Sequence, residues 1–325
     1  MAKTPVRFKR PTGLSLTRVR DRLSFLYLDK CAVVQDDNGT LAQVGVDAKK
    51  QKTVYLPVAG LSCLMLGPGT SITQQAVASL SRCGCAVSFV GSGAVRSYGA
   101  FLSPYAKTDL LVRQAQIVSD ETMRIDAARK MYVKRFPGPL FEFAPPDVKI
   151  EQLRGIEGTR MKAVYQSEAR RRRLNGWRRN SGDLGPLDAV NEALNHANTA
   201  LYGVVNSAVL ALGLSPGLGI IHQGNRNSFV LDIADLYKTE VTIPLAFSLH
   251  GSGNPGRDAT IALREKFNLL KLMPRIVDDI FDLLIPDRIA RESRRWDIDE
   301  LFLWSPESTV ESGPNYASLP VPGDT

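Results

Sequence analysis

The sequence predicts an α+β fold, in which a small, mostly β N-terminal domain precedes a larger all-α domain and a flexible C-terminal tail. Three observations support this class. Short apolar runs separated by turn residues extend to about residue 99, and apolar residues recur at helical spacing from residue 106. The last forty residues are rich in proline, serine and glycine. We therefore expect domain boundaries near residues 100, 146 and 285 of the 325-residue chain.

The first hundred residues carry the strand signals, and we expect about six to eight strands and one helix there. Residues 1–20 are basic and are expected to form an arm with little core. Asp37, Asn38 and Gly39 form a strong turn signal, and Thr70 with Ser71 is a candidate cap for a helix at 72–82. Strand candidates, where β-branched and aromatic residues gather, are 23–28, 31–34, 54–58, 62–66 and 85–90.

Helical periodicity dominates from residue 106 onward. Residues 101–146 are expected to hold connecting helices at 106–136 and a breaker-rich linker at 137–146. Residues 147–285 are expected to form the helical domain, which ends before Pro286, and residues 286–325 the extended tail. Within that domain we expect helices at 148–174 and 188–214, a further element at 228–237 and a helical region at 258–284.

The composition favours a nucleic acid as the partner but does not establish one. Lysine and arginine number 41 against 33 aspartates and glutamates, which gives a formal net charge of +8. This balance suits DNA or RNA, and it also occurs in proteins that bind neither. No apolar core follows the basic residues 1–10 as it would in a signal peptide, and the longest apolar stretches are shorter than a membrane span. The four cysteines lack metal or redox spacing, so we expect buried thiols in a cytoplasmic protein without membrane contact.

The chain contains three histidines, and one of them precedes two acidic residues. His222 follows a turn rich in proline and glycine, and Asp232 and Asp235 lie three residues apart in an apolar segment. In a helix that spacing places both carboxylates on one face. Burying two acids there is costly unless a cation neutralises them, and a divalent metal would do so with His222 as a nitrogen ligand. The alternative is an ordinary helix charge pattern beside a loop histidine.

A further carboxylate comes from Glu157, which has Gly155 and Gly158 as near neighbours. Glycines are unfavourable inside a helix, but they leave room for another group to approach the backbone. A DNA phosphate beside a metal would be such a group. The alternative is a surface glutamate paired with Arg154 or Arg160.

The order glutamate, histidine, aspartate resembles the motifs of the CRISPR-associated adaptation integrases. Members of that family insert new spacers into a CRISPR array. The resemblance rests on the segments 151–160, 191–203 and 222–235, extends to about residue 285, and is closest to the type I-E subgroup. It implies a metal-dependent DNA endonuclease and integrase that acts in antiviral defence.

The resemblance also implies the residues of the active site. Glu157, His222 and Asp235 would be the catalytic metal ligands for Mg²⁺ or Mn²⁺, and Asp232 a further acid of the metal site. The metal would stabilise charge on the phosphate, while the 3′-OH of the incoming DNA carries out a transesterification. With water as the nucleophile, the same site would hydrolyse DNA.

DNA contacts are expected from basic and aromatic residues. The arginine-rich stretch that surrounds Trp177 suits phosphate contacts combined with base stacking, although a solvated helix end is the alternative. For one aromatic residue, Tyr202, a place in the helix core is the alternative. The predicted DNA-binding residues are Arg96, Tyr202, Lys238, Arg257, Arg172, Arg173, Arg178 and Arg179.

The resemblance implies an assembly as well as a site. Homodimers would form through the β domain, and two such dimers would be bridged by a dimer of the small adaptation partner, giving a heterohexamer on double-stranded DNA with 3′-OH ends and the CRISPR array. The segment 317–322 is expected to dock on a neighbouring subunit. Two other functions remain open, a non-catalytic DNA-binding scaffold in the same assembly and a repair nuclease for branched DNA. His196 and His250 are expected to be structural.

Overall fold

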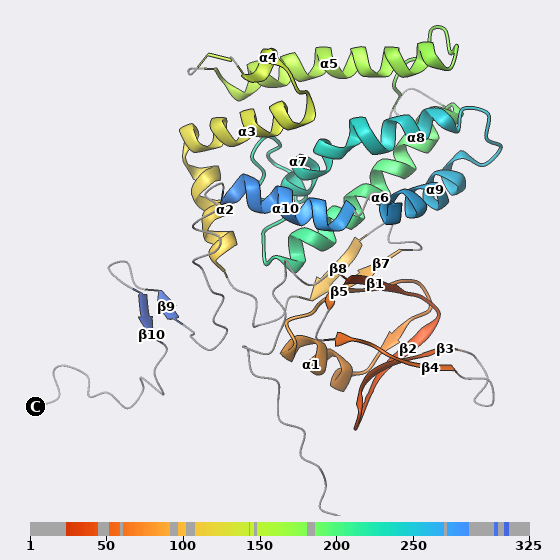
Figure 1. The fold of residues 1–325 in the computed structure, drawn as a ribbon, viewed down its shortest axis with the longest axis vertical. Helices are drawn as coiled ribbons and strands as arrows, with labels where there is room; N and C mark the ends of the chain where they lie inside the picture. Colours follow the sequence, from red (N-terminus) through yellow and green to blue (C-terminus); the bar gives the residue numbers. More distant parts are fainter. Residues whose placement is uncertain are drawn as a thin grey trace, which may run out of the picture.

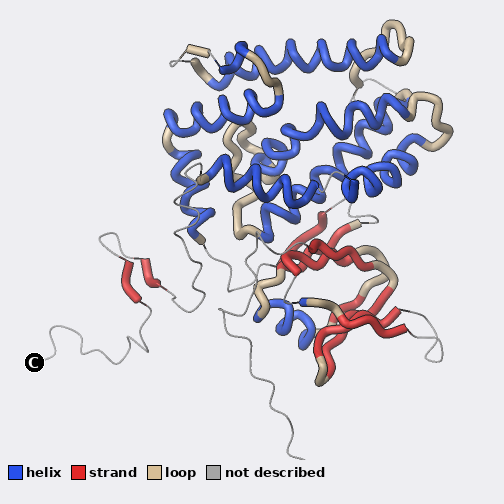
Figure 2. The backbone as a smooth tube through the Cα atoms, viewed as in Figure 1, coloured by secondary structure: helices blue, strands red, loops and turns tan. Residues whose placement is uncertain are grey.

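The computed structural model describes residues 24–44, 52–58, 61–91, 97–101, 108–142, 144–145, 148–180, 186–269, 272–285, 302–304 and 309–311. A strand-rich N-terminal part is followed by a helical part, as the sequence predicts (Figures 1 and 2). The predicted arm at 1–20 lies outside the described residues, as does nearly all of the predicted tail. Within the tail, two short strands are described, β9 (Phe302–Trp304) and β10 (Thr309–Glu311), which pair antiparallel.

Two four-stranded sheets make up the described N-terminal part. The first sheet has the order β1-β5-β7-β8, in which β1, β5 and β7 run parallel and β8 is antiparallel to β7. The second sheet has the order β4-β3-β2-β6. The strands are β1 (Ser24–Leu28), β2 (Cys31–Asp36), β3 (Gly39–Val44), β4 (Lys52–Tyr55), β5 (Leu61–Leu66), β6 (Ser71–Ile72), β7 (Ala86–Val90) and β8 (Ser97–Phe101).

Alternation along β5 explains how both faces of the first sheet are buried. Leu64 and Leu66 face the core shared with the second sheet and helix α1 (Gln74–Arg82). Cys63 and Met65 face the other way, into a small cluster that includes Ala211 of the helical part. Because successive strand residues point to opposite faces, one apolar strand joins the two parts of the molecule.

The helical part consists, within the described residues, of nine α-helices and one π-helical turn (Figure 1). Each α-helix is named here with its bounds: α2 (Asp109–Ser119), α3 (Glu121–Arg135), α4 (Pro139–Glu142), α5 (Ile150–Arg171), α6 (Ala189–Ala211), α7 (Ser228–Tyr237), α8 (Ile243–Ser248), α9 (Pro255–Leu269) and α10 (Leu272–Leu284). The π-helical turn, Lys238–Thr242, joins α7 to α8. No helix of the described chain is both long and apolar enough to cross a bilayer.

Helix α6 is the centre of the helical part. Most of its residues are buried, including Leu194, Leu201 and Val205, because small residues let neighbouring helices approach on several sides. Asp188 caps its start by accepting a hydrogen bond from the Asn191 N–H at 2.9 Å. Its last turns lie against the first sheet, where Asn206 donates a hydrogen bond to Ser97.

Several predicted elements differ from the structure in their bounds. The connecting helices expected at 106–136 are α2 and α3, which divide at Asp120, since Asp120 ends α2 and caps α3 by accepting from the Met123 N–H. Thr73, rather than Thr70 or Ser71, caps α1, and Ser71 belongs to a strand. The helical region expected at 258–284 holds two helices, α9 and α10. Helix α8 and the preceding π-helical turn were not foreseen at all.

Candidate functional site

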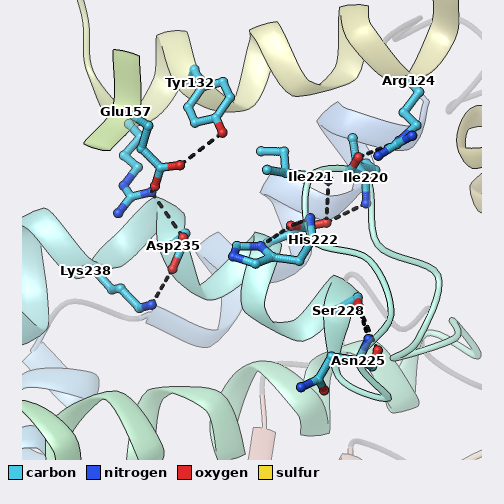
Figure 3. Close-up of polar contacts among 12 residues, drawn as sticks. Arg124, Tyr132, Glu157, Ile220, Ile221, His222, Asn225, Ser228, Asp235 and Lys238 are labelled. Carbon is cyan, nitrogen blue, oxygen red and sulfur yellow. Dashed lines mark hydrogen bonds and ion pairs between the residues drawn. The ribbon is translucent and has the colours of Figure 1, made fainter. Parts of the chain in front are cut away.

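A buried arginine joins two of the predicted site carboxylates (Figure 3). Glu157 lies on α5, Asp235 on α7 and Arg135 at the end of α3. The Arg135 Nη1 donates to Glu157 Oε1 and, at 3.2 Å, to Asp235 Oδ2. Segments separated by 22 and 100 positions in the chain thus converge on one guanidinium nitrogen.

Further side chains complete the surroundings of these carboxylates. Tyr132, one turn before Arg135, donates its hydroxyl to Glu157 Oε2 at 3.0 Å. Lys238 Nζ lies 2.5 Å from Asp235 Oδ1, and it also lies 5.0 Å from the centre of the Tyr202 ring. Each carboxylate therefore has a positively charged neighbour, which offsets the cost of placing two acids in the protein interior.

His222 lies in the loop before α7, and Asp232 of α7 holds it in place. The His222 Nδ1 lies 2.7 Å from Asp232 Oδ1, which also accepts the His222 backbone N–H at 2.9 Å. The other oxygen, Asp232 Oδ2, accepts the N–H groups of Ile220 and Ile221 at 2.5 and 3.1 Å. Because Asp232 is fully buried and takes the Nδ1 hydrogen, the Nε2 lone pair of a neutral His222 is left to bind another group.

The loop that carries His222 is braced from the opposite side. Gln114 of α2 bonds the backbone of Ser215 and Leu218, and Arg124 of α3 donates to the Ile220 carbonyl at 2.7 Å. At Gly219 an added Cβ would overlap the His222 carbonyl oxygen and lie 2.5 Å from Ser228 Cβ. The loop can therefore close over α7 only with glycine at this position.

The charges of the site shift the pKa values of its acid and its histidine in opposite directions. The hydrogen bond to Asp232 raises the pKa of His222 above its ordinary value, although burial acts against it. Burial alone would raise the pKa of Asp235, but Lys238 and Arg135 outweigh burial and hold that pKa below its ordinary value. Asp235 is therefore ionised at neutral pH.

The donors at this site fit a divalent cation, although they are not arranged as a ready cluster. Two ionised oxygens and an imidazole nitrogen are the mixed ligand set that Mg²⁺ or Mn²⁺ accepts, and a positive charge already bridges Glu157 and Asp235. Within the described residues, however, no three His, Cys, Asp or Glu side chains stand close enough to hold a metal as they are. Asp232 uses both oxygens to hold His222 and its loop, which suits a supporting residue better than a direct ligand.

The predicted DNA-binding residues fall into three groups. Arg173, Arg178 and Arg257 are exposed and Arg172 is partly exposed, whereas Arg96 lies outside the described residues. Arg179 is engaged within the protein, where it donates to Asn191 Oδ1 and Asn195 Oδ1 at 2.9 and 2.6 Å. Of the remaining two, Lys238 pairs with Asp235, and Tyr202 lies against Lys238.

Trp177 differs from its expected role. Its ring packs between Tyr165 and Phe247, with ring centres 5.6 and 4.7 Å away, and its Nε1 donates to Asp188. It is therefore a packing residue of the helical part rather than an exposed stacking platform. His196 and His250 also lie in other surroundings, His196 with its ring against Gly256 and His250 with Nδ1 3.2 Å from the Phe247 carbonyl.

Sequence reasoning missed Arg135 and Tyr132. Arg135 stands in the last turn of a helix that ends in Lys134 and Arg135, which is the ordinary place for basic residues. Only its almost complete burial, with 4% of the side chain exposed, distinguishes it from a surface arginine. The helical period does place Tyr132 and Arg135 on one face, but it says nothing of which acids they meet.

A comparison with protein families matches residues 142–259 to the family described as CRISPR associated protein Cas1. The matched range contains Glu157, His222 and Asp235. The chain is 37% identical over 276 residues to the CRISPR-associated endonuclease Cas1 1 of Rhodospirillum rubrum, covering 82% of this chain and 86% of that protein. It is 33% identical over 299 residues to the CRISPR-associated endonuclease Cas1 of Escherichia coli, covering 91% and 95%.

The fold agrees with solved structures as well. The crystal structure of a TtCas1–DNA complex superposes with a TM-score of 0.70 and 34% identity, and the match covers 83% of this chain and 99% of that one. A match over this share of the chain is larger than either the strand-rich part or the helical part alone, so the similarity includes residues of both.

Proposed function

The chain belongs to the Cas1 family of CRISPR-associated endonucleases, and from this premise we propose that it is a metal-dependent DNA endonuclease and integrase. The observation that carries the proposal is the convergence of Glu157, Asp235 and the Asp232-held His222 from separate elements (Figure 3). A DNA-binding scaffold would have no need to enclose one buried and one partly buried carboxylate and to orient a histidine beside them, since each of these costs folding energy.

In this proposal Glu157, His222 and Asp235 hold Mg²⁺ or Mn²⁺, which supplies charge stabilisation at the scissile phosphate. The other residues act on those ligands. Asp232 fixes the ring orientation of His222 and directs Nε2 toward the site, and Tyr132 orients Glu157 through its hydroxyl. Lys238, next to Asp235, adds a positive charge for the phosphodiester backbone.

The reaction we propose is a strand transfer without a covalent enzyme intermediate. The 3′-oxygen of the incoming DNA forms a bond to a phosphorus of the target strand, and the bond between that phosphorus and the target 3′-oxygen breaks. The attacking hydroxyl loses its proton, and the released 3′-oxygen gains one. When water replaces the incoming 3′-OH, the same exchange is hydrolysis, which accounts for an endonuclease activity.

DNA is the proposed substrate, and the comparison with a TtCas1–DNA complex supports it. Arg172, Arg173, Arg178 and Arg257 are the proposed backbone contacts because each is at least partly exposed. Arg96, Lys238, Tyr202 and Arg179 remain proposals of the same kind, the last three with contacts inside the protein already described. The net charge of +8 favours the same partner.

We infer the assembly from the family resemblance. Homodimers and a small adaptation partner would form a heterohexamer, in which two sites lie at a defined separation on the DNA. The type I-E form is also an inference, because relatives from different organisms match at 37% and 33% and do not single out one subgroup. Mixing the purified chain with small partners of different subgroups, and measuring the mass of each complex, tests both inferences.

The experiment that tests the function is a strand-transfer assay. It combines the protein, its small partner, a duplex with 3′-OH ends and a supercoiled plasmid that carries a CRISPR array, with Mn²⁺, Mg²⁺ or EDTA. Wild type is compared with His222→Ala, Asp235→Ala and, as a matched control, His250→Ala. His250 is an exposed histidine outside the site.

We expect strand transfer by wild type and His250→Ala with either metal, and none in EDTA or in the two site variants. Each lost ligand should lower the rate by about a hundredfold or more. Tight DNA binding by wild type without transfer or cleavage in any metal would contradict the proposal and support the scaffold. Cleavage of branched DNA alone would support the repair nuclease.

A further inference from the structure

Arg135 is the most deeply enclosed positively charged group of the site. Its side chain is 4% exposed, and it connects α3 to both α5 and α7. Its guanidinium also lies 5.0 Å from the Phe136 ring centre, and Nη2 lies 3.1 Å from Met161 Sδ. Nothing in the strand-transfer chemistry assigns a role to this residue.

The hydrogen bonds of Arg135 are poor for a purely structural arginine. One nitrogen, Nη1, serves both Glu157 and Asp235, while the buried Nε has no hydrogen-bond partner within the described residues. By contrast, Arg275 reaches Glu240 with two parallel bonds of 3.0 and 2.9 Å at the surface. A buried N–H without a partner is costly, so the guanidinium is not optimally satisfied where it lies.

The charges around Arg135 explain what this residue does in the metal-free site. Glu157 and Asp235 carry two negative charges, and Arg135 and Lys238 carry two positive ones. Without a metal, the charges of Glu157 and Asp235 are therefore already balanced by Arg135 and Lys238. A divalent cation placed between the carboxylates would meet a guanidinium that already neutralises them, and like charges repel strongly in a buried site.

We propose that Arg135 is an internal counter-ion for the metal-free site, which a divalent cation must displace from Glu157, so that metal binding competes with this ion pair until a DNA phosphate is present. This inference rests on the proposed metal site. A phosphate adds the negative charge that the metal-loaded site lacks, and it offers the displaced guanidinium two oxygens in the geometry that arginine prefers. Metal and DNA should therefore bind with positive coupling.

The experiment measures Mn²⁺ affinity by titration calorimetry on metal-free protein, with and without a DNA duplex. Wild type is compared with Arg135→Gln, which removes the charge but retains hydrogen-bonding capacity. The control is Arg171→Gln, which removes an exposed guanidinium from its pair with the buried Glu168 on the far part of α5. Thermal unfolding of the metal-free proteins is recorded in parallel.

Without DNA, Arg135→Gln should bind Mn²⁺ about tenfold more tightly than wild type, whereas Arg171→Gln should match wild type. DNA should tighten Mn²⁺ binding to wild type by about tenfold and to Arg135→Gln by less. The melting temperature of metal-free Arg135→Gln should be lower than that of wild type. Added Mn²⁺ should raise the melting temperature of Arg135→Gln by more than that of wild type. Unchanged or weaker Mn²⁺ binding in Arg135→Gln would overturn the proposal.

Two further measurements keep the outcome interpretable. If Arg135→Gln does not fold, Arg135→Lys replaces it, because lysine retains the positive charge without the planar guanidinium. Arg135→Lys should bind Mn²⁺ no more tightly than wild type, and DNA should still tighten Mn²⁺ binding to wild type. Equal Mn²⁺ affinity of wild type with and without DNA would overturn the role of Arg135. Absence of Mn²⁺ binding in every variant, even with DNA, would instead overturn the metal site and with it the proposed function.

Discussion

Asp232 is a charged side chain with no exposure to solvent, and its surroundings explain why the chain tolerates it. Backbone N–H groups of Ile220, Ile221 and His222 and the His222 ring all point at its two oxygens. These hydrogen bonds replace the hydration that Asp232 loses on burial, and they fix the loop that carries His222 to helix α7. The same residue thus serves stability and site geometry.

Replacing Asp232 allows its effect on stability and its effect on metal binding to be measured without an assay of strand transfer. In Asp232→Asn an amide NH₂ must face backbone N–H donors, so unfolding should become easier by about 1–3 kcal/mol. Because His222 loses the partner that orients it, Mn²⁺ affinity in the presence of DNA should fall by about 10- to 100-fold. Chemical denaturation and calorimetry measure the two quantities.

The control for this substitution is Asp120→Asn. Asp120 caps α3 through the Met123 N–H, and asparagine caps helices about as well as aspartate. Its stability and Mn²⁺ affinity should therefore remain near those of wild type. Equal effects in the two variants would mean that Asp232 has no special place in the site.

The resemblance of three sequence motifs to the family made Glu157, His222 and Asp235 candidates, whereas the residues taken singly left ordinary alternatives open. The structure brings Glu157 and Asp235 to one guanidinium and holds His222 through Asp232. The supporting contacts could not be predicted in this way. Arg135 looks like any basic residue at a helix end, because its partners lie 22 and 100 positions away. Burial and pairing of such a residue depend on helix packing, which local sequence does not contain.

At the level of elements, the loop before α7 depends on one close approach of its backbone. Gly219 and Gly217 lie two positions apart in the same turn, but only Gly219 lacks room for a side chain. At Gly217 the nearest atom to an added Cβ is the Arg226 carbonyl oxygen at 3.6 Å, an ordinary contact. The pair therefore provides a matched comparison.

Gly219→Ala should destabilise the protein by about 1–3 kcal/mol, because the loop must move away from Ser228 and carries His222 with it. Strand transfer should fall together with stability. Gly217→Ala should change the melting temperature little and retain strand transfer. Full activity in Gly219→Ala would show that the loop adjusts without displacing His222.

The β2–β3 hairpin provides a test of electrostatics outside the site. Asp36 accepts hydrogen bonds from the Tyr55 hydroxyl at 2.7 Å and from the N–H groups of Asn38 and Gly39 at 2.8 and 2.9 Å. The Tyr55 bond is the main cause that lowers the pKa of Asp36 below its ordinary value. The turn is thus held by the ionised carboxylate.

A lowered pKa gives the hairpin a defined pH dependence. The stabilisation is present above the ordinary aspartate pKa of about 3.9 and is lost as pH falls through the lower pKa of the folded protein. In Tyr55→Phe the pKa of Asp36, followed by NMR titration of its carboxyl carbon, should rise toward the ordinary value. An unchanged pKa would mean that the backbone N–H groups alone set it.

Long periodic segments were the most predictable elements. The predicted helix at 188–214 contains α6 with its cap at Asp188, and the further element expected at 228–237, whose type the sequence left open, is α7. The parallel order of β1, β5 and β7 was not foreseen, because strand pairing depends on contacts between segments distant in sequence. Helix α8 was missed since it has six residues and follows a π-helical turn, too short for periodicity to reveal.

On the scale of the whole molecule, the two parts are joined by the buried contact between α6 and the first sheet. The helical part contains the site, and the exposed arginines predicted to bind DNA also lie on it. We therefore expect its basic residues to contribute to DNA affinity by their position as well as by their number. A positive charge at one of those positions should contribute more to DNA affinity than the same charge on the strand-rich part.

DNA binding in EDTA, measured by fluorescence anisotropy over a range of salt concentrations, tests this distinction. Affinity should fall linearly on logarithmic axes, because each neutralised phosphate releases counterions. Arg178→Ala removes an exposed arginine of the helical part, and should weaken binding and reduce the slope by about one. Lys52→Ala removes the same charge from exposed strand β4, and should leave the slope unchanged. Equal changes in both variants would show that net charge alone drives binding, and that the arginines of the helical part form no defined DNA-binding surface.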